Sequence, residues 1–164
     1  GGRVTTDFAG GFDDAGALVV QGGKLVAAGG ATTGSGPDFA LARYDDYGSL
    51  DPTFGTGGKV TTDFAPVFGD ADEINALVVQ QGKLVAAGSS FTGGGLRFDF
   101  ALARYRQNGD LDTTFGTGGT TTTDFAHRED RAKALVVQGG RPVAVGSAVS
   151  GSGKQTFALA RYLS

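Results

Sequence analysis

The sequence predicts an all-β fold, a β-propeller with three four-stranded blades per chain. The hexapeptide Phe-Ala-Leu-Ala-Arg-Tyr occurs three times, beginning at Phe39, Phe100 and Phe157. An Asp-Phe pair recurs with spacings of 56 and 61 residues, a period close to that of propeller blades. Glycine is abundant, 30 of 164 residues, and no stretch has a sustained helical period. Such a composition is typical of many short strands joined by turns.

The first two strands of each repeat are predicted to form a hairpin. In the first copy they cover residues 17–21 and 24–29, and the glycines at 22 and 23 can both take the positive φ of a two-residue turn. Gln81-Gly82 and Gly139-Gly140 occupy the same place in the other copies. Neither strand alternates apolar with polar residues, so we expect both faces of the hairpin to be buried.

The third strand, residues 39–44, has two different faces. Phe39 and Leu41 are bulky and share one face, whereas Ala40 and Ala42 are small and share the other. One bulky and one small face suit sheets that stack face to face and interdigitate. A radial stack of four-stranded sheets is a β-propeller.

A connector rich in turn residues, 48–55, leads to the fourth strand, residues 59–64. This strand is more polar than the others, as expected of the outer strand of a blade. The aromatic residue of the connector, Phe54 in the first copy and Phe115 in the second, is expected to pack under the blade.

These motifs resemble the bacterial delta-60 repeat. The resemblance covers nearly the whole chain and implies propeller blades in an exported or surface-associated bacterial protein. It implies no general activity, and it carries over no catalytic residues. The chain departs from the family's pattern in two places. Its hairpin turn is Gly-Gly or Gln-Gly where the family commonly has Asp-Gly, and its third copy stops at Ser164 without the connector. The motifs are Asp-Phe-Ala-Leu-Ala-Arg-Tyr at 38–44, Gly-Ser-Leu-Asp at 48–51, Thr-Phe-Gly at 53–55 and Gly-Gly-Lys-Val-Thr-Thr-Asp-Phe at 57–64.

We expect one repeat domain over residues 1–164, with repeats at about 1–56, 57–117 and 118–164. Residues 3–8 match the outer strand but precede any blade, and the last blade ends on its third strand.

Three blades are fewer than the usual range of about 4–8, and an open apolar edge is a hazard unless it is paired. We therefore expect half of a six-bladed ring, closed as a homodimer in which each N-terminal strand joins the partner's last blade. A piece of a longer chain with more repeats is the alternative.

Composition makes several partners unexpected. The net charge is −3 without a basic cluster, so nucleic acid is not an expected partner. The longest apolar runs have about five residues, far too few for a membrane span.

Cysteine is absent, which excludes disulfides and thiolate metal sites. Methionine is also absent, and we expect the sequence to begin after a processing or cloning cut.

Sequence variation between the three copies falls on the loops of one face. Loops on a rigid scaffold commonly carry binding residues, so we predict that a ligand binds there, with drift in unconstrained loops as the alternative. The candidate binding residues are Asp13, Asp14, Asp70, Asp72, Glu73, Glu129, Asp130, Phe91 and Arg97.

The acidic members of this set precede the innermost strands and are expected to ring the axial opening. They could hold Ca²⁺, or a cationic or sugar ligand, through carboxylate oxygens. Their spacing does not match an EF-hand, and capping of turns by Asp side chains is the favoured explanation. We therefore predict no metal site and no cofactor.

Charged residues that recur in strand interiors are predicted to be structural. The arginine stems would lie between blades, with their heads paired to the recurrent aspartates or to backbone carbonyls. The recurrent tyrosines would pack with their hydroxyls at the rim. His127, the one histidine, is expected to be solvated, and no catalytic residue is predicted. The arginines are Arg43, Arg104 and Arg161, the aspartates Asp7, Asp63 and Asp124, and the tyrosines Tyr44, Tyr105 and Tyr162.

The sequence thus predicts a non-enzymatic binding or scaffold propeller, exported or displayed on a bacterial surface, with a protein or glycan ligand. One alternative is a metal-assisted hydrolase or lyase, which needs carboxylates that converge with His127 at the axial mouth. Another is a structural module of a larger adhesin or fibre.

Overall fold

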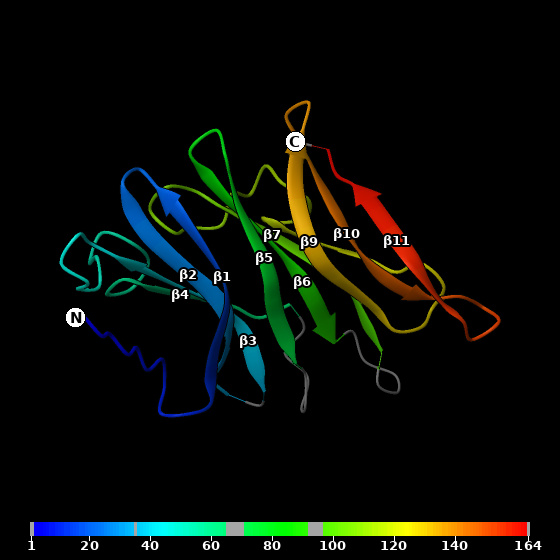
Figure 1. Ribbon diagram of the computed structural model, residues 1–164, viewed down its shortest axis with the longest axis horizontal. Coiled ribbons are helices and arrows are strands. Elements are labelled where there is room, and N and C mark those ends of the chain that lie inside the picture. The colour runs from blue at the N-terminus through cyan, green and yellow to red at the C-terminus, as the bar shows by residue number, and fades with distance from the viewer. Residues whose placement is uncertain (1, 35, 65–70, 92–96, 164) are drawn as a thin grey trace.

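A computed structural model describes residues 2–34, 36–64, 71–91 and 97–163 of the chain. This part of the chain consists of eleven strands and turns, without a helix, so it holds no helix that could cross a membrane. Three antiparallel sheets lie side by side, and their first strands β1, β5 and β9 lie next to one another (Figure 1). The predicted all-β propeller fold is confirmed.

Each sheet is a simple meander in chain order. The first consists of β1 (Asp13–Gln21), β2 (Lys24–Thr32), β3 (Pro37–Tyr44) and β4 (Lys59–Thr62). The second consists of β5 (Asp72–Gln80), β6 (Lys83–Phe91), β7 (Phe98–Tyr105) and β8 (Thr120–Thr123). The third consists of β9 (Asp130–Gln138), β10 (Arg141–Val149) and β11 (Gln155–Arg161), so it has three strands in the described residues.

The hairpin turns between the first two strands form as predicted. Gly22 and Gly23 have φ of 58° and 84°, and Gln81 takes a φ of 51° in the same position of the second copy. The innermost strands begin four residues earlier than predicted, because the ladder continues to Asp13, which pairs with Ala31.

Two predicted strand ranges are wrong. The fourth strand ends at Thr62 rather than at residue 64, since its ladder with β3 covers four residue pairs. Residues 3–8 form no strand among the described residues, because no neighbouring strand supplies hydrogen bonds to them.

A β-bulge interrupts each innermost strand near its beginning. The strand opposite carries a glycine at this point in all three sheets, Gly29, Gly88 and Gly146. A Cβ at Gly88 would lie 1.8 Å from the carbonyl oxygen of Glu73, so the bulged backbone leaves room for hydrogen alone. Bulges of this kind re-aim the side chains that precede them.

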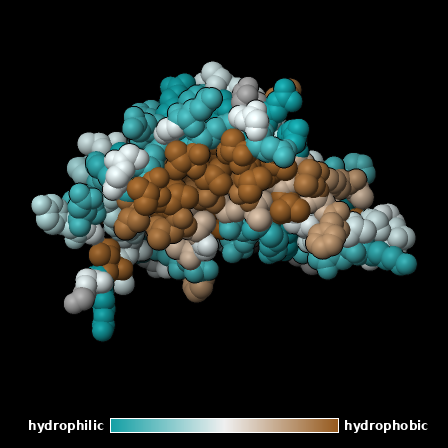
Figure 2. Space-filling view, turned by 45° about the horizontal axis from the view of Figure 1, so that its top comes forward, coloured by the Kyte–Doolittle hydropathy of each residue, from teal (hydrophilic) through white to brown (hydrophobic). Residues whose placement is uncertain are grey.

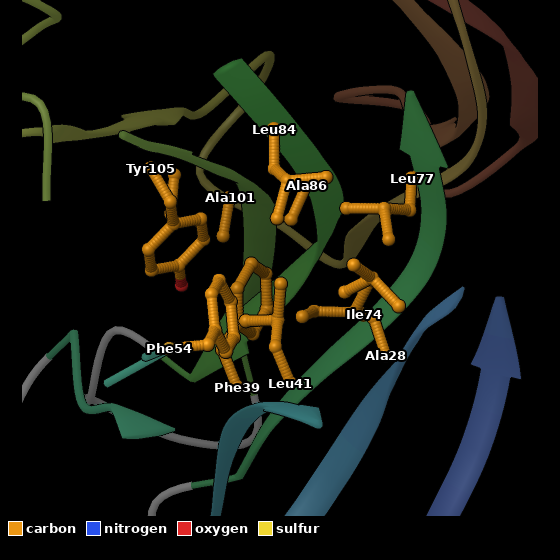
Figure 3. Packing of buried hydrophobic residues seen from close by; sticks show 12 residues of the cluster. Ala28, Phe39, Leu41, Phe54, Ile74, Leu77, Leu84, Ala86, Ala101 and Tyr105 are labelled. Atoms are coloured by element: carbon orange, nitrogen blue, oxygen red, sulfur yellow. The ribbon is translucent and has the colours of Figure 1, made fainter. Parts of the chain in front are cut away.

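The hydrophobic core lies between the sheets, in two clusters. Between the first and second sheets, Phe39, Leu41 and Phe54 pack against Leu84 and Tyr105 (Figure 3). A second cluster of the same kind joins the second and third sheets. The connector aromatics Phe54 and Phe115 are 0% and 1% exposed, which confirms that they pack under their blades.

Burial of both faces of the hairpin is confirmed for the middle sheet but not for the outer two. Leu84 and Val85, on opposite faces of β6, are both fully buried. Leu18 and Leu25 in the first sheet are 63% and 44% exposed, because no sheet covers that face among the described residues. Figure 2 shows a continuous band of hydrophobic residues along the molecule. Large exposed residues of the innermost strands are Leu18, Val20, Val79, Val136 and Val137.

We predict that Gly88→Ala destabilises the chain by about 1–3 kcal/mol, because the new methyl group overlaps the Glu73 carbonyl across the bulge. Urea denaturation followed by circular dichroism measures the change. Gly151→Ala is the matched control, since a Cβ there meets no atom within 4 Å. Equal stability of the two variants would contradict the steric role of Gly88.

Candidate functional site

The strand ends that the variable loops join lie on one rim of the propeller. In an antiparallel meander, the first residues of β1, β5 and β9 lie at the same end of each sheet as the last residues of the second strand and the first residues of the third. This end is the lower edge in Figure 1, where β1, β5 and β9 begin. The bulges lie close by and place Asp14, Glu73 and Arg131 at equivalent positions, since their carbonyls face the three bulge glycines.

A pocket of about 280 Å³ opens on this rim, and we name it the mouth pocket. It is formed by all three sheets, because Asp14 comes from β1, Glu73 from β5 and Arg131 from β9. Its residues are Phe12, Asp14, Gly30, Pro37, Ala71, Asp72, Glu73, Phe98 and Arg131. The pocket therefore combines carboxylates, one guanidinium and two aromatic rings.

The guanidinium of Arg131 is held in place from two sides. Its Cζ lies 3.7 Å from the centroid of the Phe98 ring, a cation–π contact. Its Nε donates a hydrogen bond of 2.8 Å to Oε1 of Glu129. Phe98 in turn contacts Phe91 edge to face, with ring centroids 5.7 Å apart. The positive charge at the pocket is thus fixed in position, whereas Phe12 stands 78% exposed beside it.

The structure brings together part of the predicted binding set. Asp14, Asp72 and Glu73 line the mouth pocket directly. Phe91 and Glu129 support it through Phe98 and Arg131.

Other members of the set lie elsewhere. Arg97 lines a separate hollow with Glu129, His127 and Arg128. Asp70 lies outside the described residues.

The charged and aromatic residues of the mouth pocket that sequence reasoning missed are Phe12, Phe98 and Arg131. A comparison of the copies held a signal for Arg131, since it occupies the position of Asp14 and Glu73 with the opposite charge. The aromatic residues gave no such signal, because nothing in their spacing says that they lie on the same rim pocket.

One aspartate near the start of each innermost strand binds a backbone N–H group that precedes it in the chain. Asp13, Asp72 and Asp130 accept hydrogen bonds of 3.0, 2.9 and 2.7 Å from backbone N–H groups. The three donors are the phenylalanines of the Asp-Phe pairs, Phe8, Phe64 and Phe125.

Asp72 and Asp130 are fully buried in these positions. Burial raises the pKa of Asp130, the hydrogen bond from Phe125 opposes this, and the nearby carboxylates of Asp124 and Asp99 raise it further. These aspartates therefore tie one blade to the next, and Asp72, which also lines the mouth pocket, is already bound by the Phe64 N–H.

Two groups of three carboxylates are the residues that could hold a metal ion in the described part of the chain. Each group bridges two sheets, and its oxygen atoms lie within 4.8 Å of one another. The groups are Asp38, Asp63 and Asp72, and Asp99, Asp124 and Asp130. They share Asp72 and Asp130 with the acidic set that the sequence suggested, and the other four carboxylates were not in that set. The absence of a cofactor stays a prediction.

The predicted aspartate partners of the recurrent arginines are wrong. Arg43 Nε lies 2.7 Å from Oδ2 of Asp51, and Arg104 Nε lies 2.8 Å from Oδ2 of Asp112. Antiparallel pairing puts Phe39 opposite Thr62, so Asp63 lies near the beginning of β3 while Arg43 lies near its end.

The predicted contact with a backbone carbonyl does occur, since Nη1 of Arg43 donates to the Gln107 carbonyl at 2.5 Å. Arg161 is exposed and donates to Gln138 instead. Asp7 and Asp124 accept hydrogen bonds from backbone N–H groups of their own loops, those of Gly10 and Ala126.

The tyrosine hydroxyls lie between blades rather than at the rim as predicted. The Tyr105 hydroxyl is buried and donates to Thr62 Oγ1 at 2.9 Å, on the outer strand of the preceding sheet. Burial raises the pKa of Tyr105. Tyr162 makes the same contact with Thr123 at 3.0 Å. These bonds fix how far each sheet is rotated from the next.

His127 is a surface residue, as predicted. Its side chain is 87% exposed, and Nδ1 lies 2.5 Å from Oδ2 of Asp124. It lines the hollow with Arg97 and not the mouth pocket. The carboxylates of the pocket therefore do not converge with this imidazole.

Comparison with protein families supports the propeller repeat. A family described as "Domain of unknown function (DUF5122) beta-propeller" matches residues 23–54 and 82–115. The two matched segments are equivalent, since each covers the second and third strands and the connector up to its buried phenylalanine. No curated protein matches the chain.

We predict that Asp112→Asn destabilises the chain by about 3 kcal/mol, because it leaves the buried guanidinium of Arg104 without its counter-charge. Lys83 above all, with Thr114 and Arg104, lowers the pKa of Asp112 against the opposing effect of burial. This stabilisation is present above the unfolded pKa of about 4 and is lost as pH falls toward the lower folded value.

Urea titrations at pH 7 and pH 3 test this effect, and Asp46→Asn, at an exposed aspartate of the other connector, is the control. The difference in the free energy of unfolding between wild type and Asp112→Asn should be smaller at pH 3 than at pH 7. A difference that grows in acid would contradict the stabilising role of the ionised Asp112 carboxylate.

Proposed function

We propose that the chain is a non-enzymatic binding module: a half-propeller that a second copy completes to a six-bladed ring, and that engages a protein partner at the mouth pocket. The observation that carries the binding proposal is the mouth pocket itself, where three sheets place fixed charges of both signs beside an exposed ring. Self-association is supported by a separate observation, the two uncovered sheet faces.

The uncovered faces are the repeat equivalents of surfaces that are buried inside the chain. Leu18 and Leu25 correspond to Leu77 and Leu84, which are 7% and 0% exposed in the middle sheet. At the other end, Phe157 is 98% exposed, whereas its equivalent Phe100 is fully buried. Each end therefore presents one half of an inter-blade contact that the chain makes twice internally.

We predict that light scattering of the 164-residue chain at micromolar concentration gives the mass of two chains. Leu18→Asp places a charge on the uncovered face of the first sheet and should raise the dimer dissociation constant about 100-fold or more, since an unpaired charge is costly to bury.

Tyr47→Asp is the control for this experiment, because Tyr47 is 94% exposed on a connector. Both variants should keep the far-ultraviolet dichroism of the wild type. A folded wild-type monomer would refute the closed ring, and a dimer unchanged by Leu18→Asp would place the contact elsewhere.

The chemistry of the mouth pocket favours a peptide segment that carries a basic residue. Asp14 and Glu73 are exposed carboxylates that can pair with a lysine or arginine, and Phe12 offers apolar surface next to them. A sugar ring would stack on an open aromatic face, but Arg131 already covers one face of Phe98. These features support a protein ligand over a glycan.

We predict that a displayed library of random peptides, screened with the chain, yields sequences in which a basic and an apolar residue are neighbours. The double variant Phe12→Ala with Glu73→Gln should lower the affinity for the selected peptides about tenfold or more, as expected for a central aromatic and a paired charge.

Tyr47→Ala is the matched control, since it removes an exposed ring from the opposite rim. Binding that both variants weaken equally, or binding seen on a glycan array and not in the peptide library, would refute the proposed ligand.

The delta-60 resemblance supports an exported or surface-associated bacterial protein as the setting for this module. The alternative, a module of a larger adhesin or fibre, would use the same uncovered faces. It predicts a mass that rises with concentration beyond the mass of two chains.

A further inference from the structure

Residues 2–8 lie against the first sheet in the place of an outer strand. Side chains at alternate positions, Val4, Thr6 and Phe8, face this sheet and line a hollow of about 480 Å³ with Leu18, Leu25 and Tyr44. Alternation of this kind is the pattern of a β-strand. These residues nevertheless form no ladder within the described chain.

The contacts that hold this segment repeat those of the true outer strands. Thr6 Oγ1 lies 2.7 Å from the Tyr44 hydroxyl, as Thr62 and Thr123 lie against Tyr105 and Tyr162. The Phe8 N–H donates to Asp13 as that of Phe64 donates to Asp72. Val4 Cγ2 approaches Gly48 just as Val60 Cγ2 approaches Gly109. The segment thus sits as β4 sits against the second sheet.

A complementary strand edge lies on the third sheet. The third sheet ends on β11, and no fourth strand pairs with it in the described residues. Phe157 and Leu159 are 98% and 63% exposed. In the first two sheets the equivalent phenylalanines contact a second ring edge to face, Phe39 with Phe64 and Phe100 with Phe125.

We infer that residues 3–8 of one copy pair with β11 of a second copy as its fourth strand, in a defined register. This inference rests on the proposed ring closure and adds the partner strand and the residue pairs. In the first sheet Phe39 pairs with Thr62 and Ala40 with Thr61. The equivalent pairs across the two copies are Phe157 with Thr6 and Ala158 with Thr5.

The second copy is the occupant that fits, because the segment need not move. It already makes the contacts of an outer strand with its own first sheet, and the partner's third sheet would dock on that sheet as its neighbour. The new contact continues the two inter-blade contacts within the chain. Phe8 would then pack against Phe157 as Phe64 packs against Phe39.

Cysteine cross-linking tests the register, since the natural chain has no cysteine. Arg43 N–H donates to Gly58, so the neighbouring pairs alternate and the Ala40–Thr61 pair is not hydrogen-bonded. Opposed residues in such pairs lie at a distance that a disulfide spans. The double variant Thr5→Cys with Ala158→Cys should form a covalent dimer on mild oxidation, seen on a non-reducing gel.

The mixed experiment gives the sharper result. Thr5→Cys and Ala158→Cys, each prepared alone and then mixed, should form one disulfide between unlike chains. Ala40→Cys with Thr61→Cys is the positive control and should close within one chain. Thr6→Cys with Ala158→Cys is the register control, because its two side chains point to opposite faces, and it should cross-link at least about tenfold more slowly.

The outcomes separate this inference from the ring proposal. Interchain disulfides at Thr5 and Ala158 support both. A dimer mass without this disulfide, while the positive control closes, overturns the strand exchange and leaves the dimer standing. A monomer without cross-links overturns both and assigns the β11 edge to a strand from elsewhere, and an intrachain disulfide shows that the chain closes on itself.

Discussion

Each sheet in the described part of the protein has two apolar faces, and burying such a face requires a second sheet stacked on it. The middle sheet satisfies this requirement fully, with Leu84 and Val85 on opposite faces of β6 both buried. The outer sheets satisfy it on one face each. Face-to-face burial therefore fixes the stacking of the sheets, and it also explains why Leu18 on the first sheet and Phe157 on the third are exposed.

Polar contacts decide how the stacked sheets are aligned. A buried guanidinium in each of the first two sheets binds the aspartate of its connector. Its Cζ also lies over the connector's phenylalanine ring, 4.5 Å from the ring centroid in the first copy and 4.9 Å in the second. The connector ring is thereby pressed into the contact with the next sheet. Tyrosine–threonine bonds and aspartate–amide bonds join the same two sheets, and their partners Thr62 and Phe64 lie close together along the chain. Because all these groups recur with the repeat, each junction is aligned in the same way.

The rim that carries the mouth pocket uses the freedom left by this scaffold. Bulges opposite Gly29, Gly88 and Gly146 turn out the second residue of each innermost strand, a position at which the repeat does not keep one side chain. The three copies accordingly differ at this position, with Asp14, Glu73 and Arg131. Repeated residues thus build the frame, and the residues that differ between repeats give the rim its chemistry.

The sequence by itself determined the fold class, the hairpins and the buried connector rings, since each depends on local spacing or on a turn that glycine makes possible. The tertiary structure alone decided the ion-pair partners and the pocket. Arg43 meets Asp51 rather than Asp63 because strand register sets which end of β3 each aspartate reaches. Phe12, Phe98 and Arg131 line one pocket because three sheets converge on one rim. Their positions are far apart along the chain, so the sequence alone does not indicate that they lie together.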